Sequence, residues 1–319
     1  MKPVELIPIA LILILISSTV GSAQRRTGLS RFEDMVREAN STEAGQLSES
    51  PFEQPAPLSP ESTTDCAPGR TWTSSNVDAY FTQFCVSEHG NITSLISPAG
   101  FQHIRVGDII EGYTLSISSS GSALLIYYDA GASESGWGPP KISHTSSGAP
   151  VITRRTNNPS TGYVLELMQI FYMSPDDREG FIYMRVTNLS QVYVTSVSLS
   201  RYFDGDIDNN GSTDVYNRTA DSVEGRQGNA TGHGLMLDMV GAYQWSKAIN
   251  NWEPAAYTYK TAVLKKPFNP TNLTAAPVAT PTSPGDYVGR ITFNLGQISG
   301  TSSDPSGGRK AVMFRYHRF

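Results

Sequence analysis

Short runs of apolar and β-branched residues, separated by turn residues, fill the chain from about residue 65 to its end. In residues 192–200, small polar side chains alternate with apolar ones. This alternation is typical of an antiparallel strand with one solvated face. No long amphipathic helical pattern accompanies these runs. The predicted strands are Tyr80–Val86, Ile92–Ile96, Ile109–Ile117, Ala123–Tyr128, Tyr163–Tyr172, Phe181–Val186, Val192–Phe203, Gly234–Val240, Ala256–Leu264, Arg290–Leu295 and Ala311–Tyr316.

So many strands in one segment predict an all-β fold, a large antiparallel β-sandwich over residues 65–319. Two smaller stacked sandwiches are the alternative. Residues 24–64 are acidic and rich in Pro and Ser, which predicts a disordered linker, an N-terminal tail to the domain. Within it we expect a short helix over residues 30–40, because Ser30 can cap it and Glu33 follows three residues later.

Residues 1–23 have the pattern of a secretory signal peptide. An apolar run from Leu6 to Ile16 is followed by small residues that would permit cleavage before Gln24. As a helix this run rises about 16 Å, too little for a hydrocarbon core of about 30 Å. We therefore expect a secreted, extracellular protein, or a periplasmic or cell-surface one in a bacterium. An uncleaved N-terminal anchor is the alternative, and we expect no membrane span after cleavage.

The chain has two cysteines, Cys66 and Cys85, and an exported protein would most simply join them in a disulfide. Two buried thiols are the alternative. N-glycosylation sequons are also present, which predicts a glycoprotein if the source is eukaryotic and nothing if it is bacterial. They lie at Asn40, Asn91, Asn188, Asn210, Asn217, Asn229 and Asn272.

Residues 204–214 carry the most specific motif of the chain. Counted from residue 206, oxygen-bearing residues occupy positions 1, 3, 5, 7 and 9, and glycine occupies position 6, as in a calcium loop. Asn217 stands where an EF-hand has its bidentate Glu, so we expect weak affinity, about 10⁻⁴–10⁻³ M. The predicted Ca²⁺ ligands are Asp206, Asp208, Asn210, Ser212 and Asp214.

This loop resembles the calcium loops of dockerin, thrombospondin type 3 and β-propeller repeats, although those families repeat the loop and this chain has it once. The alternative is a plain polar turn, since Asp, Asn and Gly are also turn residues. Asn210 is both a predicted ligand and a sequon, and a glycan there would exclude the ion.

Sequence motifs of catalysis are absent. None of the five histidines has metal-ligand spacing, and no nucleophile elbow or P-loop occurs. The net charge of −5 argues against nucleic-acid binding. Aromatic side chains can stack on sugars, and the richest aromatic group, which could equally belong to the core, comprises Trp245, Trp252, Tyr257 and Tyr259.

Two passages resemble the galactose-mutarotase-like super-sandwich family. One is the segment from His89 to Phe101; the other contains residues 181–190, with the sequence Val-Thr-Asn, and continues to Ser200-Arg-Tyr-Phe. The resemblance implies a super-sandwich fold and a link to sugars. Ser200 occupies the place of the family's catalytic His, which argues against mutarotase activity.

Together these features favour a secreted, non-catalytic binding or structural module of the extracellular space, which calcium stabilises. Its partner would be an extracellular carbohydrate or protein. The alternative is a carbohydrate-active enzyme or carbohydrate-binding protein on a super-sandwich. The sequence leaves the ligand and the oligomeric state open.

Overall fold

The computed structural model describes most of the chain from residue 71 onwards and one segment before it. The described residues are 29–41, 71–73, 83–96, 101–104, 109–118, 124–131, 133–156, 162–173, 179–207, 211–228, 233–303 and 308–319. The predicted signal peptide, Cys66, Asp208 and Asn210 lie outside them, so these predictions stay predictions. Cys85 is buried in strand β2, and its pairing with Cys66 remains a prediction. Among the described residues, no helix has the length and apolar character to cross a membrane.

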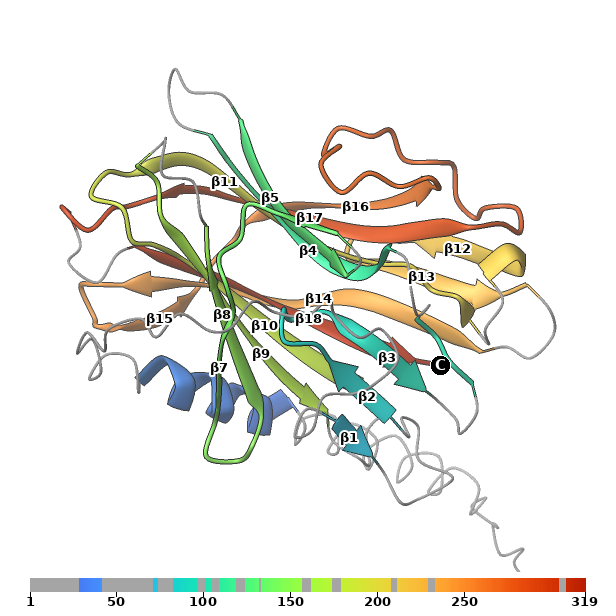
Figure 1. Ribbon diagram of the computed structural model, residues 1–319, viewed down its shortest axis with the longest axis horizontal. Coiled ribbons are helices and arrows are strands. Elements are labelled where there is room, and N and C mark those ends of the chain that lie inside the picture. The colour runs from blue at the N-terminus through green and yellow to red at the C-terminus, as the bar shows by residue number, and fades with distance from the viewer. Residues whose placement is uncertain are drawn as a thin grey trace, which may run out of the picture.

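Two large antiparallel sheets stack face to face, which confirms the all-β sandwich (Figure 1). One sheet has, in spatial order, β12 (Asp214–Arg218), β13 (Ser222–Gln227), β14 (Gly234–Ser246), β18 (Arg309–Arg318), β10 (Glu179–Asn188), β9 (Leu165–Met173), β8 (Pro150–Arg155) and β7 (Lys141–His144), and β15 (Asn251–Pro254) pairs with β14. The other has β16 (Thr258–Lys265), β17 (Tyr287–Ile298), β11 (Val194–Phe203), β4 (Ile109–Ser118), β5 (Leu125–Gly131) and β6 (Glu134–Ser135).

A third, small sheet consists of β1 (Thr71–Thr73), β2 (Gln83–Val86) and β3 (Ile92–Ile96). A 3₁₀ turn, η2 (Gly211–Thr213), precedes β12. The strand prediction missed β1, β6, β7, β8, β12, β13 and β15. In β12 and β13, charged and polar residues interrupt the apolar alternation, and β7 and β15 are too short to show a period.

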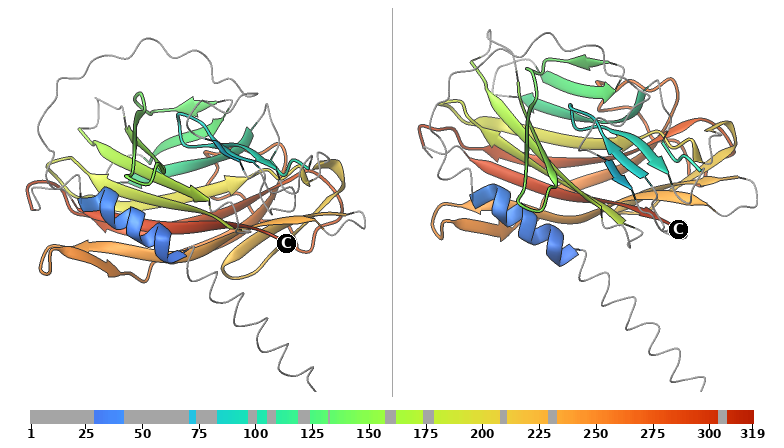
Figure 2. Two further views of the ribbon diagram at one scale, coloured as in Figure 1. Left: turned by 90° about the horizontal axis from the view of Figure 1, so that it is seen from below. Right: turned by 60° about the horizontal axis from the view of Figure 1, so that its bottom comes forward.

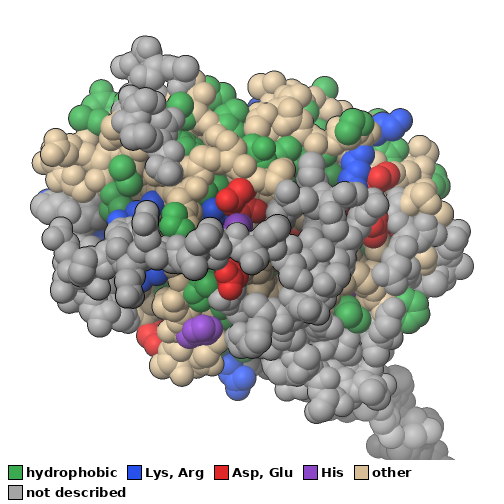
Figure 3. All heavy atoms as spheres, in the orientation of Figure 1, with side chains coloured by type: hydrophobic (Ala, Val, Ile, Leu, Met, Phe, Trp, Pro, Cys, Tyr) green, Lys and Arg blue, Asp and Glu red, His purple; other side chains and the backbone are tan. Residues whose placement is uncertain are grey.

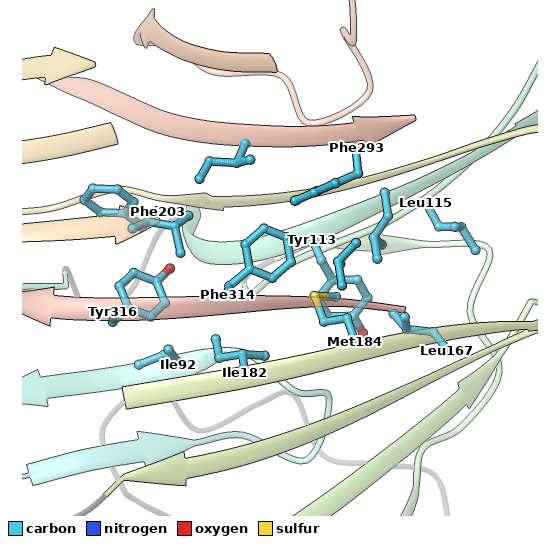
Figure 4. Packing of buried hydrophobic residues seen from close by; sticks show 14 of the residues in the cluster. Ile92, Tyr113, Leu115, Leu167, Ile182, Met184, Phe203, Phe293, Phe314 and Tyr316 are labelled. Atoms are coloured by element: carbon cyan, nitrogen blue, oxygen red, sulfur yellow. The ribbon is translucent and has the colours of Figure 1, made fainter. Parts of the chain in front are cut away.

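The main core lies between the two large sheets (Figure 4). Leu115, Phe203 and Phe293 of the six-stranded sheet face Ile182 and Phe314 of the nine-stranded one. Side chains of a strand alternate between its two faces, so every second residue of β9 and β10 enters this core. The intervening residues are also buried, which means that the nine-stranded sheet is covered on its outer face too.

A helix of residues 29–41 provides that cover (Figure 2). Phe32 is 0% exposed, and its ring stacks on Tyr172 of β9 and Phe181 of β10 at centroid distances of 6.0 and 5.4 Å. At the other end of the helix, Asn40 donates to the Tyr183 hydroxyl and accepts from Arg185 Nη1 at 2.6 Å. The helix therefore belongs to the folded domain, although the sequence placed it in a disordered linker.

Three predicted sequons have their side-chain nitrogen inside the fold. A glycan attaches to Asn Nδ2, and in these residues Nδ2 donates a buried or part-buried hydrogen bond, so glycosylation would break it. The three are Asn40, Asn91 and Asn188. Asn272 is exposed and Asn217 is half-buried, and glycosylation there remains a prediction.

Replacing Phe32 with Ala should detach the helix, because the helix contributes no other fully buried apolar side chain. A buried Phe→Ala change costs about 3–5 kcal/mol. We expect amide hydrogen exchange in residues 29–41 to accelerate at least about tenfold, the counterpart of 1.4 kcal/mol. Arg31→Ala, at an exposed position of the same helix, is the control and should leave exchange unchanged. Equal protection in Phe32→Ala and the wild type would contradict this account.

Candidate functional site

The turn between β2 and β3 places a histidine at the edge of the sandwich. Ser87 Oγ accepts hydrogen bonds from the backbone N–H groups of His89 and Asn91, at 3.2 and 3.1 Å. Gly90 adopts φ +90°, and a Cβ there would lie 2.1 Å from Gln169 Nε2. The turn thus requires glycine after His89, both for its backbone conformation and for the close approach of β9.

A buried ion pair holds this turn from inside the sandwich. Glu111 of β4 and Arg201 of β11 are both 0% exposed and form a two-pronged contact, with Arg201 Nη2 at 2.6 Å from Glu111 Oε2. Arg201 Nη2 also donates to Gly90 O at 3.1 Å. Glu111 Oε2 accepts from the backbone N–H of Ile92 at 2.7 Å. The pair therefore fixes Gly90 within the turn and Ile92 at the start of β3.

His89 joins two carboxylates and an arginine that come from three other elements. Its Nδ1 lies 3.1 Å from Asp129 Oδ2 in β5 and 3.2 Å from Glu134 Oε2 in β6. Arg154 of β8 reaches the same two oxygens, with Nη1 2.5 Å from Asp129 and Nη2 2.6 Å from Glu134. We call His89, Asp129, Glu134 and Arg154 the His89 cluster.

Surrounding groups fix the positions of the cluster residues. The Tyr113 hydroxyl donates to His89 O at 2.8 Å, and Asn91 Nδ2 donates to Asp129 Oδ1 at 2.5 Å. Arg154 donates to Gly138 O and lies 5.7 Å from the centre of the Trp137 ring. The Asp129 and Arg154 side chains are 0% and 1% exposed, whereas those of His89 and Glu134 are 15% and 40% exposed. The cluster thus has a rigid floor and a solvent-facing side. On the face drawn in Figure 3, acidic, basic and histidine side chains gather near the middle of the molecule.

The same contacts determine the charges. Burial lowers the pKa of His89, but its hydrogen bonds to Asp129 and Glu134 outweigh this and raise the pKa to about 9. Burial raises the pKa of Glu134, but the hydrogen bond to His89 and the charge of Arg154 outweigh it and lower the pKa to about 2. At neutral pH the histidine is therefore an imidazolium, and Glu134 is a carboxylate.

This geometry suits proton transfer. Both carboxylates contact Nδ1, so Nε2 is the ring nitrogen left without a protein partner among the described residues. A carboxylate that orients an imidazole through one nitrogen, with the other facing a ligand, is a recurring arrangement of general acids and bases. His89, Asp129 and Glu134 also lie close enough to hold a metal ion. Arg154 and the protonated His89 together balance the two carboxylates, and Arg154 contacts the same carboxylate oxygens, so a metal cation would have to displace a buried guanidinium.

Three of the five predicted calcium ligands belong to the described residues. Asp214 is buried, and its Oδ2 accepts from the backbone N–H of Ile207 at 2.9 Å. Asp206 is half-buried and Ser212 is exposed, while Asp208 and Asn210 lie outside the described residues. Calcium binding by this loop remains a prediction. Asp206 instead lies close to two acidic residues outside the predicted set, Asp204 and Asp286.

The four predicted ligand-binding aromatics do not form one platform. Trp245 and Trp252 contact each other at 5.8 Å on the outer face of the nine-stranded sheet, where Trp252 also meets Tyr183. Tyr257 and Tyr259 pack instead against the core between the sheets. Sugar stacking could use only the tryptophan pair, and this role stays a prediction.

The resemblance to galactose-mutarotase-like proteins sets Ser200 where those proteins have a catalytic histidine. Ser200 is 1% exposed, and its Oγ lies 2.8 Å from the Thr292 hydroxyl on the neighbouring strand.

Little in the sequence indicates the His89 cluster. Its members lie in four separate segments, and only the fold brings them together. His89 stood in a passage that resembled the super-sandwich family, but as part of a turn. Two features could have marked the cluster: a His-Gly-Asn turn between strands, and charged residues inside otherwise apolar strands.

No protein-family model matches the sequence, and no curated protein sequence is significantly similar to it. Among solved structures, the chain is similar to a bacterial glucoamylase complexed with acarbose, with a TM-score of 0.39 and 8% identity over 82% of this chain and 34% of that one. A galactose mutarotase related enzyme from Lactobacillus acidophilus gives a TM-score of 0.37 and 10% identity over 78% of this chain and 97% of that one.

A polysaccharide lyase gives a TM-score of 0.34 and 8% identity over 82% of this chain and 33% of that one. This chain thus spans about a third of the length of the glucoamylase and of the lyase. These similarities concern the fold alone and assign no activity.

Arg201→Met should destabilise the protein strongly, because it leaves the Glu111 carboxylate buried without its counter-ion. Removing one partner of a buried pair costs about 3–5 kcal/mol. The double variant Glu111→Leu/Arg201→Met should lose less free energy of unfolding than Arg201→Met alone, since it leaves no buried charge without a partner. Urea unfolding measures both. The control is Arg37→Met, which breaks the surface ion pair with Asp34. The Arg37 side chain is 76% exposed, so this change should lower the free energy of unfolding by under about 1 kcal/mol. Equal losses for Arg201→Met and Arg37→Met would contradict the role of the buried pair.

Stability should also depend on the charge of His89. Its pKa is raised on folding from 6.5 to about 9, so the charged form stabilises the fold fully below about pH 6.5, and this contribution is lost as pH rises through about 9. At pH 6 the free energy of unfolding of the wild type should exceed that of His89→Gln by on the order of 2–3 kcal/mol, and this difference should shrink towards zero at pH 10. Urea unfolding of both proteins across this range is the measurement. A difference that stays constant with pH would show that His89 is not charged in the fold.

Proposed function

We propose that this protein binds a neutral carbohydrate at the His89 cluster and that His89 transfers a proton to one of its oxygens. One observation carries the proposal. Asp129 and Glu134 both engage Nδ1 of a partly exposed imidazole, which leaves Nε2 for a ligand.

The protonation state favours an acid over a base. With a pKa of about 9, His89 carries a proton on Nε2 at neutral pH. Asp129 is buried and holds the ring through Nδ1, so the imidazole need not reorient when the proton leaves. The proton would go to the oxygen of a breaking glycosidic C–O bond, and that oxygen departs as an alcohol. Water would form the new bond to the carbon and release a proton to solvent, so that the net reaction is hydrolysis.

The charge balance favours a neutral ligand. Two cations, His89 and Arg154, face two anions, Asp129 and Glu134, so the cluster has no net charge to attract a polyanion. Glu134 is 40% exposed and lies beside His89, which places an acceptor and a donor next to each other. A sugar hydroxyl, which both donates and accepts, matches such a pair. The predicted secretion would bring the protein to extracellular polysaccharides.

The test is turnover of neutral and uronic-acid polysaccharides by the full chain, with products identified by mass spectrometry and binding measured separately. We expect cleavage of a neutral glycan. His89→Gln should reduce turnover by about 10²–10⁴-fold, the usual contribution of a general acid, and change binding little. His144→Gln is the matched control, because His144 is exposed on β7 and pairs with Pro150, four residues before the cluster residue Arg154 on β8.

Two results would overturn the proposal. Glycan binding without turnover, unaffected by His89→Gln, would instead support the non-catalytic binding module that the sequence favoured. If the protein neither binds nor cleaves any glycan of the panel, the proposed link to carbohydrates is wrong.

A further inference from the structure

Three aspartates from two distant segments meet at one end of the six-stranded sheet. Asp204 and Asp206 follow β11, which ends at Phe203, and Asp286 directly precedes β17. The two strands are antiparallel neighbours, with Phe203 opposite Gly289, so the end of one lies beside the start of the other. The sheet register therefore brings residues some eighty positions apart in the sequence to the same end of the sheet. A motif within one loop could not contain all three.

The carboxylates of these residues converge. Each of Asp204, Asp206 and Asp286 offers an oxygen that lies within 4.8 Å of the other two. Two oxygen ligands on opposite sides of a Ca²⁺ ion, each about 2.3–2.6 Å from it, lie about 4.6–5.2 Å apart, which matches the spacing of these carboxylate oxygens. Asp206 and Asp286 are half-buried, so water can complete the coordination.

Asp204 has an unused oxygen despite its burial. The residue is 1% exposed, and its Oδ1 has no hydrogen-bond partner among the described residues. Its one ion-pair partner there is Lys266, whose Nζ contacts Oδ2 and also lies 3.2 Å from Asp286 Oδ1. A buried carboxylate oxygen normally has a partner, because leaving it unpaired is costly. The lack of a hydrogen-bond partner for Asp204 Oδ1 within the described part of the chain therefore indicates that this oxygen binds a ligand.

Asp214 positions the two acidic segments. Its Oδ2 accepts from the N–H of Ile207, one residue after Asp206, and its backbone oxygen accepts from the N–H of Gly285, one residue before Asp286. Tyr216 adds a second anchor, since its hydroxyl hydrogen-bonds both the N–H and the oxygen of Gly205, between the first two aspartates. The backbones that carry the three carboxylates are thus fixed before any ion binds.

We propose that Asp204, Asp206 and Asp286 form a binding site for a divalent cation, with Ca²⁺ the best fit. The site differs from the calcium loop that the sequence predicts. Asp206 is common to both, but Asp286 comes from another part of the chain, and Asp214 Oδ2 accepts from the backbone N–H of Ile207. This proposal is independent of the function proposed for the His89 cluster.

Lys266 competes for this position. Its ammonium lies between Asp204 and Asp286, where the cation would bind, and its side chain is 17% exposed, so it has a route to solvent. The ion must displace it, which makes binding weaker than three carboxylates alone would give. It follows that removing the ammonium strengthens cation binding, the opposite of what a purely structural ion pair would predict.

The experiment is titration of the full-length protein with Tb³⁺, observed by tyrosine-sensitised luminescence, followed by displacement with Ca²⁺ and Mg²⁺. Tyr216 and Tyr287 lie beside the site and can sensitise the ion. We expect Asp286→Asn to weaken Ca²⁺ binding at least tenfold and Lys266→Met to strengthen it at least threefold. Asp208→Asn, in the predicted loop but outside the proposed ligands, is the matched control and should change affinity less than threefold.

Other outcomes would overturn the proposal. If Asp208→Asn abolishes binding and Asp286→Asn leaves it intact, the ion binds the loop predicted from the sequence. If no variant changes Tb³⁺ binding, or if Ca²⁺ does not compete below about 10 mM, beyond the range of extracellular calcium modules, these aspartates form no cation site. Asp286 is 43% exposed, so its substitution leaves the fold intact, and circular dichroism of each variant checks this.

Discussion

The buried pair of Glu111 and Arg201 is the interaction on which the candidate site depends. Two charges inside a sandwich are costly unless each is fully hydrogen-bonded, and here each is. Arg201 bonds Glu111, Gln169 and Gly90, while Glu111 also bonds Ile92 and Tyr316. These partners belong to both large sheets and to the β2–β3 turn, so the pair joins three parts of the fold. An apolar pair of similar volume would fill the same space, but it would not fix the turn that carries His89.

The His89 cluster repeats this arrangement one step closer to the surface. Asp129 and Arg154 are as buried as Glu111 and Arg201, yet the second pair of groups in the cluster, His89 and Glu134, contacts solvent. Arg154 and the imidazolium together balance the two carboxylates, and the contacts of Nδ1 with Asp129 and Glu134 fix the position of the ring. The interior therefore holds His89 in one orientation while the exposed half can meet a ligand, as the proposed proton transfer requires.

The sequence was sufficient for the fold class and insufficient for the site, for a physical reason. Strands such as β11 can be predicted from the alternation of polar and apolar side chains with a period of two, and this signal is local in the sequence. The His89 cluster depends on which strands are neighbours and in which register, and Tyr113 opposite Asp129 is set by pairing that no local pattern encodes. The helix of residues 29–41 shows the same limit. Its capping residues predicted a helix, but Phe32 could be recognised as buried only once β9 and β10 offered an apolar outer face.

The calcium motif marks a region in which the fold gathers acidic side chains, and Ca²⁺ binding by the predicted loop stays a prediction. Asp, Asn and Gly at alternating positions serve both ion binding and tight turns. In the fold, Asp214 Oδ2 accepts from the backbone N–H of Ile207, and this contact closes the turn. That closure in turn presents Asp204 and Asp206 towards Asp286 across the sheet edge. A motif counted along the chain could not include Asp286, because sheet register, rather than sequence spacing, makes it a neighbour.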